Sequence, residues 1–203
     1  MQVVILTDIQ LKNELLGTTS SLPQNIIWVE ELSELQNHKD ADAFVDLLFN
    51  KDHLTTLKAL LPKLVVINSV IDTLSETNPS FVRINAWPTF LQSNLIEASS
   101  AEESKKQLTE ELLSLFNKKI EWLPDEPGFV TPRIISMIIN EAFISLKEGV
   151  STKQEIDTAM KLGTNYPYGP FEWAERIGMN HIQALLQKLA ERQPRYTSFI
   201  SAG

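Results

Sequence analysis

Seven short apolar runs, separated by stretches with helical spacing, dominate the first 123 residues of the chain. The runs are rich in valine, isoleucine and leucine and lie at residues 3–6, 26–29, 43–48, 64–67, 81–84, 94–98 and 120–123. Helix-type patterns lie between them at residues 11–16, 31–36, 52–61 and 101–116. Short buried strands that alternate with helices are typical of βα units around a mostly parallel sheet. The sequence therefore predicts an α/β domain over residues 1–123.

The remaining chain, residues 124–203, has a different pattern. A turn-rich Pro-Asp-Glu-Pro-Gly segment is followed by a threonine and a proline that suit the start of a helix. Thr152 with Glu155 forms a capping box for a second helix, which we expect to end at Gly163. Two more helical patterns cover residues 172–177 and 182–189. This part is predicted to be an all-α domain.

Glycine is nearly absent from the predicted α/β domain. Of the seven glycines, Gly17 alone precedes Gly128. Loops that cradle phosphate groups need at least two glycines close together, because the backbone must approach the phosphate oxygens closely. A glycine-rich phosphate loop is therefore excluded from the first 127 residues.

The chain is acidic and has no cysteine. Its 26 Asp and Glu residues outnumber its 18 Lys and Arg residues, which gives a net charge of −8 and an isoelectric point near 4.9. Such a charge repels nucleic acid and anionic membranes. No apolar run is long enough to span a bilayer, and the N-terminus lacks the pattern of a signal peptide. With no disulfide chemistry available, these features favour a cytoplasmic protein without a nucleic-acid or membrane partner.

A dense string of motifs between residues 127 and 172 is similar to the start of the C-terminal domain of L-3-hydroxyacyl-CoA dehydrogenases. It begins with Pro-Gly-Phe-Val-Thr-Pro-Arg at 127–133 and continues through Asn-Glu-Ala at 140–142 and Glu-Gly-Val at 148–150. It ends with Ile-Asp-Thr-Ala-Met-Lys-Leu-Gly at 156–163 and Tyr-Pro-Tyr-Gly-Pro-Phe-Glu at 166–172. An unrelated helical domain is not expected to carry these motifs in this order.

The resemblance implies a two-domain architecture. A shortened Rossmann-like domain with a mostly parallel sheet would occupy residues 1–123, and the all-α domain over residues 124–203 would form a homodimer and help to enclose an acyl-CoA. In this family, NAD accepts a hydride from the 3-hydroxy carbon while a His–Glu pair removes the hydroxyl proton. A neutral imidazole is a competent base near pH 7, and a carboxylate fixes its tautomer.

The cofactor loop of the family is the first part that this sequence lacks. The resemblance sets Thr7, Ile9 and Lys12 in the three glycine slots after the first strand. Branched side chains at such positions put methyl groups where phosphate oxygens would lie. Glu30, at the end of the second strand, corresponds to the acidic residue that binds the adenosine ribose, but it is more simply interpreted as an exposed carboxylate at a strand end. We therefore expect no NAD cofactor, and Glu30 is the one cofactor-binding position retained.

The catalytic pair of the family falls on Asn85 and Glu97. Alignment of residues 81–98 with the family's His-Phe-Phe-Asn-Pro and Leu-Val-Glu stretch places Asn85 in the histidine slot and Glu97 in the glutamate slot. An amide does not accept a proton at neutral pH, so Asn85 would at most hydrogen-bond a substrate oxygen. Glu97 is either a vestige of the pair or a plain polar residue on a half-buried strand.

Other substrate-binding positions also depart from the family. Its asparagine within the histidine motif aligns with Pro88, and its asparagine after Pro-Gly-Phe aligns with Pro132. The serine that contacts the substrate hydroxyl aligns with Val70, although neighbouring Ser69 could replace it if the register shifted. The segment between residues 30 and 64 is shorter than in the family, so we expect the helical hairpin that contacts CoA to be absent.

The three histidines show no metal-ligand spacing. His38, His53 and His181 lie in polar surroundings, and each is expected to be solvated. The four tryptophans are expected to anchor cores and interfaces rather than to stack on nucleic-acid bases, since the chain is acidic. No metal site is predicted.

The sequence supports a leading hypothesis and two alternatives. In the first, the chain is a pseudoenzyme of the family that lacks NAD-dependent activity and binds an acyl-CoA-like small molecule or serves as a partner subunit. In the second, it remains an oxidoreductase acting on 3-hydroxyacyl-CoA, with NAD held by side chains and with a base other than histidine. In the third, it is a purely structural homodimer.

Overall fold

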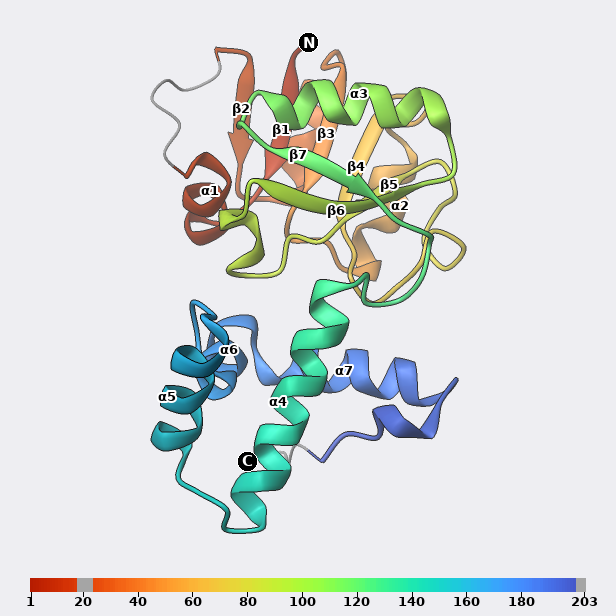
Figure 1. Cartoon of the computed structure of the whole chain (residues 1–203). Helices are drawn as coiled ribbons and strands as arrows, with labels where there is room; N and C mark the ends of the chain where they lie inside the picture. Colours follow the sequence, from red (N-terminus) through yellow and green to blue (C-terminus); the bar gives the residue numbers. More distant parts are fainter. Residues whose placement is uncertain (18–23, 200–203) are drawn as a thin grey trace. The chain divides into compact units, whose positions relative to one another are not determined.

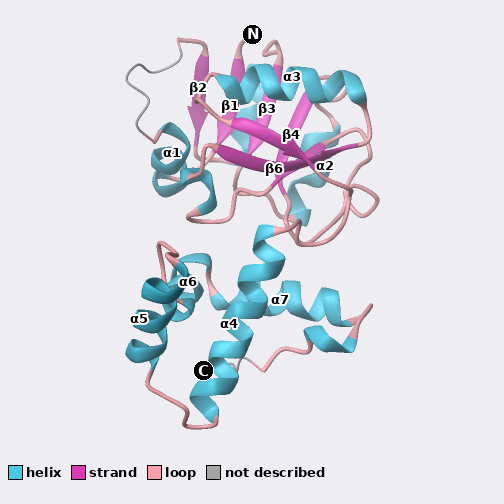
Figure 2. Ribbon diagram, viewed as in Figure 1, coloured by secondary structure: helices cyan, strands magenta, loops and turns pink. Residues whose placement is uncertain are grey.

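The computed structural model describes residues 1–17 and 24–199, and the chain divides into two compact units, Met1–Phe129 and Val130–Gly203. The first unit contains a sheet covered by helices, and the second contains helices (Figures 1 and 2). The division falls six residues after the predicted boundary at residue 123. The reason is that the linker residues Asp125 and Glu126 bind Arg83 of the sheet unit.

The first unit is built on one seven-stranded sheet with the order β2-β1-β3-β4-β5-β6-β7. Its strands are β1 (Val3–Leu6), β2 (Ile26–Val29), β3 (Ala43–Asp46), β4 (Leu64–Asn68), β5 (Val82–Ile84), β6 (Leu95–Ser100) and β7 (Lys119–Trp122). β1 to β5 are parallel, and β6 and β7 form a parallel pair that runs antiparallel to β5. The predicted fold class, an α/β unit with a mostly parallel sheet, is confirmed, and all seven predicted strands are present.

Both faces of this sheet are buried. α1 (Ile9–Leu16) and α3 (Glu103–Ser114) pack on one face, and η1 (Leu32–His38) and α2 (Leu54–Lys58), preceded by η2 (Lys51–His53), pack on the other. Figure 1 shows α3 lying across the strands. Burial on both faces explains why β1 is continuously apolar instead of alternating. The helix predicted at 31–36 forms as a 3₁₀ helix, and the one predicted at 52–61 is reduced to η2 and α2.

The second unit consists of α4 (Thr131–Lys147), α5 (Lys153–Thr164), α6 (Pro170–Ile177), α7 (Met179–Ala190) and η4 (Pro194–Tyr196). The predicted capping box of α5 is confirmed: the Glu155 amide donates to Thr152 Oγ1 at 3.3 Å, and the Thr152 amide donates to Glu155 Oε2 at 3.1 Å. The predicted helix end at Gly163 is wrong. Gly163 lies inside α5, and the left-handed residue that ends the helix is Asn165, with φ 57°. Among the described residues, no helix is long and apolar enough to cross a membrane.

The strand order places a topological switch between β1 and β3. The chain passes from β1 outward to β2 and then returns to the other side of β1. Open α/β sheets bind ligands outside the carboxyl ends of the strands at such a point. A ligand-binding site is therefore expected at the carboxyl ends of the strands. The polar residues there are Asp8 and Glu30 after β1 and β2, Asp46 on β3, Ser69 after β4 and Asn85 after β5.

Candidate functional site

The N-terminus of α1 faces the position where a cofactor pyrophosphate would bind in a Rossmann-like sheet. Asp8 caps this helix, and its Oδ1 accepts the amide hydrogen of Leu11 at 2.8 Å. A helix N-terminus attracts anions through its free amides and its dipole, and here the chain's own carboxylate takes that place. A pyrophosphate bound at this end of α1 would be repelled by the negative charge of the Asp8 carboxylate.

The residues in the three glycine slots do not fit a pyrophosphate either. Thr7 is 2% exposed and continues the β1 ladder, because its amide donates to the Val29 carbonyl at 3.0 Å. Ile9 is 71% exposed, so an isoleucine side chain projects where the glycine loop would leave space. Lys12 Nζ lies 4.8 Å from the centre of the Trp28 ring. Glu30 is exposed after β2, as expected for a carboxylate at a strand end.

The structure brings Asn85 and Glu97 together. β5 and β6 are antiparallel, and the Asn85 amide donates to the Glu97 carbonyl at 2.9 Å. Their side chains also meet, since Asn85 Nδ2 donates to Glu97 Oε2 at 3.2 Å. Asn85 is 3% exposed and Glu97 is 9% exposed, so the pair is largely removed from solvent. The spacing that placed these residues in the slots of the family's catalytic pair therefore corresponds to a real contact, with an amide in place of the imidazole.

Asn68 holds the neighbouring strand ends in register. Its Nδ2 donates to the Leu47 carbonyl at 3.0 Å and to the Ala86 carbonyl at 3.1 Å, while its Oδ1 accepts the Ala86 amide at 3.0 Å. One side chain thus links the segments that follow β3 and β5. The chain leading away from Asn85 is fixed by this bridge.

The positions aligned with the family's other polar side chains are buried or used in turns. Val70 is 2% exposed, and Ser69 Oγ donates to the Asp72 carbonyl at 2.7 Å, so this hydroxyl closes a local turn. Pro132 lies in the first turn of α4. Residues 30–64 are all described, and their helices are η1, η2 and α2, which are too short to form a helical hairpin.

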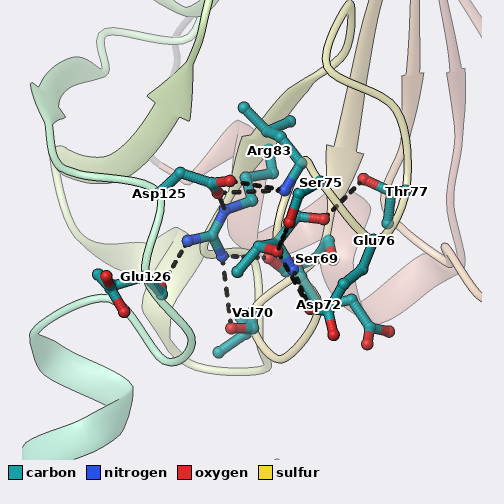
Figure 3. Close-up of polar contacts among 11 residues, drawn as sticks. Ser69, Val70, Asp72, Ser75, Glu76, Thr77, Arg83, Asp125 and Glu126 are labelled. Atoms are coloured by element: carbon teal, nitrogen blue, oxygen red, sulfur yellow. Dashed lines mark hydrogen bonds and ion pairs between the residues drawn. The ribbon is translucent and has the colours of Figure 1, made fainter.

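A buried arginine that sequence reasoning missed lies two residues before Asn85. Arg83 has a fully buried side chain, and its Nε donates to Asp125 Oδ1 at 2.6 Å (Figure 3). Its Nη1 donates to the Ser69 carbonyl at 3.0 Å, and its Nη2 donates to the Glu126 carbonyl at 2.5 Å. The guanidinium carbon also lies 4.1 Å from the centre of the Phe129 ring.

This arginine ties three separate segments together: strand β5, the loop after β4 and the linker after β7. Burial lowers the pKa of the Arg83 guanidinium, and the charge of Asp125 opposes that effect. Asp125 also accepts the Leu74 amide, at 2.9 Å to Oδ2. The sequence signal was available, because Arg83 is a lone charge inside an apolar strand, and such charges are almost always paired.

The expectation of a solvated histidine is wrong for His53. Its side chain is 14% exposed, and its Nδ1 lies 2.6 Å from Oδ2 of Asp46, which is fully buried at the end of β3. Burial raises the pKa of the Asp46 carboxyl, and the hydrogen bond and charge of His53 oppose that rise. His181 is exposed, with Nδ1 2.8 Å from the Ile177 carbonyl. No group of side chains in the described part of the chain is arranged to hold a metal ion.

The comparisons with known proteins centre on the second unit. Residues 128–200 match the family described as 3-hydroxyacyl-CoA dehydrogenase, C-terminal domain. The chain is 47% identical over 72 residues to 3-hydroxyadipyl-CoA dehydrogenase of Escherichia coli K12, and 33% identical over 108 residues to 3-hydroxybutyryl-CoA dehydrogenase of Bradyrhizobium diazoefficiens. The predicted resemblance to the L-3-hydroxyacyl-CoA dehydrogenase family is thus confirmed over residues 128–200.

The sequence matches span only part of the relatives' length. The two alignments cover 36% and 53% of this chain, but 15% and 37% of the respective relatives. The fold is shared more widely. The crystal structure of (S)-3-hydroxybutyryl-CoA dehydrogenase PaaH1 from Ralstonia eutropha superposes with a TM-score of 0.72 over 97% of this chain and 90% of that one, at 20% identity. The fold of that structure therefore extends through both units, while the family match covers residues 128–200.

Proposed function

We propose that this chain is a homodimeric, dehydrogenase-like protein of the cytoplasm that binds an acyl-CoA-like small molecule or a partner protein without NAD-dependent activity. The observation that carries the proposal is the Asp8 carboxylate seated on the N-terminus of α1. It places negative charge where the family's fold would receive the cofactor's pyrophosphate.

The charge distribution supports the same proposal. Residues 1–129 contain 19 Asp and Glu against 10 Lys and Arg, whereas residues 130–203 contain 7 against 8. The whole net negative charge of the protein therefore belongs to the sheet unit, the one that would bind the dinucleotide. A dinucleotide approaches the sheet unit against repulsion, whereas the helical unit, with 7 acidic against 8 basic residues, would not repel the phosphates of an acyl-CoA-like ligand.

The Asn85–Glu97 pair supports the absence of dehydrogenase chemistry. Oxidation of a 3-hydroxy group requires removal of the hydroxyl proton, and the amide of Asn85 does not accept a proton at neutral pH. Its Nδ2 already donates to Glu97 Oε2. This pair can bind a polar oxygen, but it lacks the imidazole that the family's reaction uses.

Calorimetric titration with NADH tests the proposal directly. We expect no saturable NADH binding below about 1 mM, which corresponds to roughly −4 kcal/mol, and no NADH oxidation with acetoacetyl-CoA. Asp8→Asn is the matched variant, because asparagine keeps the helix cap and removes the charge. It should not restore binding by itself, since Thr7 and Ile9 remain. The Escherichia coli relative serves as the positive control.

The same assays separate the alternatives. NADH oxidation that disappears in Glu97→Gln would falsify the proposal and support an active oxidoreductase with an altered site. Saturable binding of acetoacetyl-CoA without turnover supports the ligand-binding form of the proposal. Binding of neither compound leaves a partner-binding or purely structural role.

α5 supports the proposed homodimer. None of its twelve residues is buried, although it carries Ile156, Ala159, Met160 and Leu162. Leu162 is 83% exposed. Amphipathic helices in globular proteins cover their apolar side, so we propose that α5 of one protomer packs against a second protomer.

Leu162→Lys is expected to shift the protein from dimer to monomer. Light scattering after size exclusion should give twice the 23.0 kDa chain mass for the wild type and about the chain mass for the variant. Gln187→Lys, on an exposed position of α7, is the control and should remain dimeric. A wild-type protein that is monomeric at all concentrations contradicts the proposed dimer.

A further inference from the structure

The Asp46–His53 pair lies outside the machinery discussed above. Asp46 is the last residue of β3, and His53 ends η2. Asp46 Oδ2 lies 2.6 Å from His53 Nδ1, and the Leu48 amide donates to the other carboxylate oxygen at 3.0 Å. The carboxylate is therefore fixed by two donors from the seven residues that follow it. Asn85 and Glu97 lie on other strands and have no part in this pair.

The neighbours of His53 set its tautomer. Asn50 Oδ1 accepts the Asp52 amide, so Asn50 Nδ2 is the group that faces Nε2, at 2.8 Å, and donates to it; Nδ1 is then the nitrogen that donates a hydrogen bond to Asp46. A ring that donates at Nδ1 and accepts at Nε2 is a neutral imidazole with its lone pair directed away from the buried carboxylate. Asn50 itself is exposed, so the accepting nitrogen lies on the solvent side of the pair.

This arrangement has the features of a general base. A buried carboxylate behind an imidazole fixes the ring and stabilises the imidazolium that forms when Nε2 takes a proton. β3 is also one of the two strands that border the topological switch, where open α/β sheets bind their ligands. The Asp46–His53 pair therefore lies at the carboxyl end of β3, where the sheet topology favours a ligand site.

We propose that His53 and Asp46 form a general-base site, in which His53 takes a proton from water or from a hydroxyl group of a small uncharged ligand at the carboxyl end of β3. Asp46 acts through His53 and is a positioning residue. The ligand is not an anion, because the carboxyl ends of β1, β2 and β3 carry Asp8, Glu30 and Asp46, which disfavour anions. The proposal is independent of whether NAD binds.

The simplest reaction for such a base is the hydrolysis of an uncharged ester. A water oxygen bonds to the carbonyl carbon while the water proton passes to His53 Nε2. The bond from that carbon to the leaving oxygen then breaks, the leaving group departs with the electron pair, and the proton is released to it or to solvent. No metal, cofactor or oxidant is required for this balance.

Two charged residues, Lys51 and Asp52, lie on η2 beside His53. Asp52 precedes it, and Lys51 pairs with Asp72 at 2.9 Å. The Phe49 ring packs edge-on to the imidazole with 6.4 Å between ring centres.

Hydrolysis of p-nitrophenyl acetate by the full chain tests the site. His53→Gln should lower the rate above background by about 10²-fold, whereas His38→Gln and His181→Gln should leave it unchanged. Asn50→Ser should raise the rate, because serine can still cap η2 through the Asp52 amide but is too short to donate to Nε2. Asp46→Asn should lower the rate and move the midpoint of its pH profile to lower pH, since the charge that stabilises the imidazolium is lost.

Two results overturn the proposal. One is a His53→Gln rate equal to that of the other two histidine variants. The other is a pH midpoint that does not move in Asp46→Asn, which would give Asp46 a structural role alone. Nitrogen-15 NMR of the wild-type imidazoles provides a measurement that needs no variant: the proton is expected on Nδ1 of His53, and a proton on Nε2 contradicts the site.

Discussion

Replacing Arg83 with methionine is expected to lower the free energy of unfolding of the sheet unit by about 3–5 kcal/mol. Methionine fills much of the space, but it supplies no donors. The carbonyls of Ser69 and Glu126 then lose the guanidinium as a donor, and the Asp125 carboxylate loses its cation. Removing the fully buried partner costs more than an exposed pair is worth, because Ser69 is only 4% exposed and its carbonyl gains no access to water.

Urea unfolding monitored by circular dichroism measures the loss of unfolding free energy in Arg83→Met, and hydrogen exchange shows which strands are destabilised. Amides of β4 and β5 should lose protection. Lys106→Met is the control: its ion pair with Glu103 at 2.8 Å is exposed, and its loss should cost at most about 1 kcal/mol. An Arg83→Met protein as stable as the control would show that the three tied segments do not depend on this side chain.

Replacing Gly169 with alanine is expected to destabilise the helical unit by roughly 3 kcal/mol. An added Cβ would lie 2.3 Å from Asp157 Oδ1 and 2.4 Å from the Asp157 Cβ and Cγ. Asp157 would have to move, and its Oδ1 accepts the Phe171 amide at 2.8 Å. The variant thus combines overpacking with the loss of a hydrogen bond at the start of α6.

Gly163→Ala is the matched control for this prediction. An added Cβ at Gly163 meets nothing within 4 Å, and the residue lies inside α5. Alanine is therefore expected to stabilise the protein by about 0.5–1 kcal/mol, since it favours helix and loses less entropy on folding. The thermal unfolding midpoint should fall in Gly169→Ala and rise in Gly163→Ala. A shift of the same sign in both variants contradicts the steric argument.

The strands and the capping box follow from local sequence. β1 and β2 occupy the predicted residues because strands covered on both faces are continuously apolar, and that pattern is visible over four residues. Thr152 and Glu155 satisfy each other's backbone within one turn, so their hydrogen bonds need no distant partner. By contrast, Gly163 does not end α5, because Asn165 takes the left-handed conformation in its place.

The Asn85–Glu97 contact is an intermediate case. Its residues can be chosen from spacing through the family resemblance, but their meeting depends on the antiparallel register of β5 and β6. Similarly, Asp8 is recognisable as a helix cap from its position before an apolar helix. Its position beside the topological switch between β1 and β3, however, follows only from the strand order of the sheet.

By itself, the sequence determined the α/β pattern of the first unit, the helical second unit, the resemblance of residues 128–200 to the dehydrogenase family and the absence of a glycine-rich loop after the first strand. Each of these depends on residue identity and spacing over a few turns or strands. The tertiary structure alone decided that Arg83 binds Asp125, 42 positions away, and that His53 turns back onto Asp46 instead of facing solvent. Arg83 and Asp46 are both buried ionisable groups, and such a group can be buried only where the folded chain supplies its partner, so the local sequence pattern does not reveal which partner it finds.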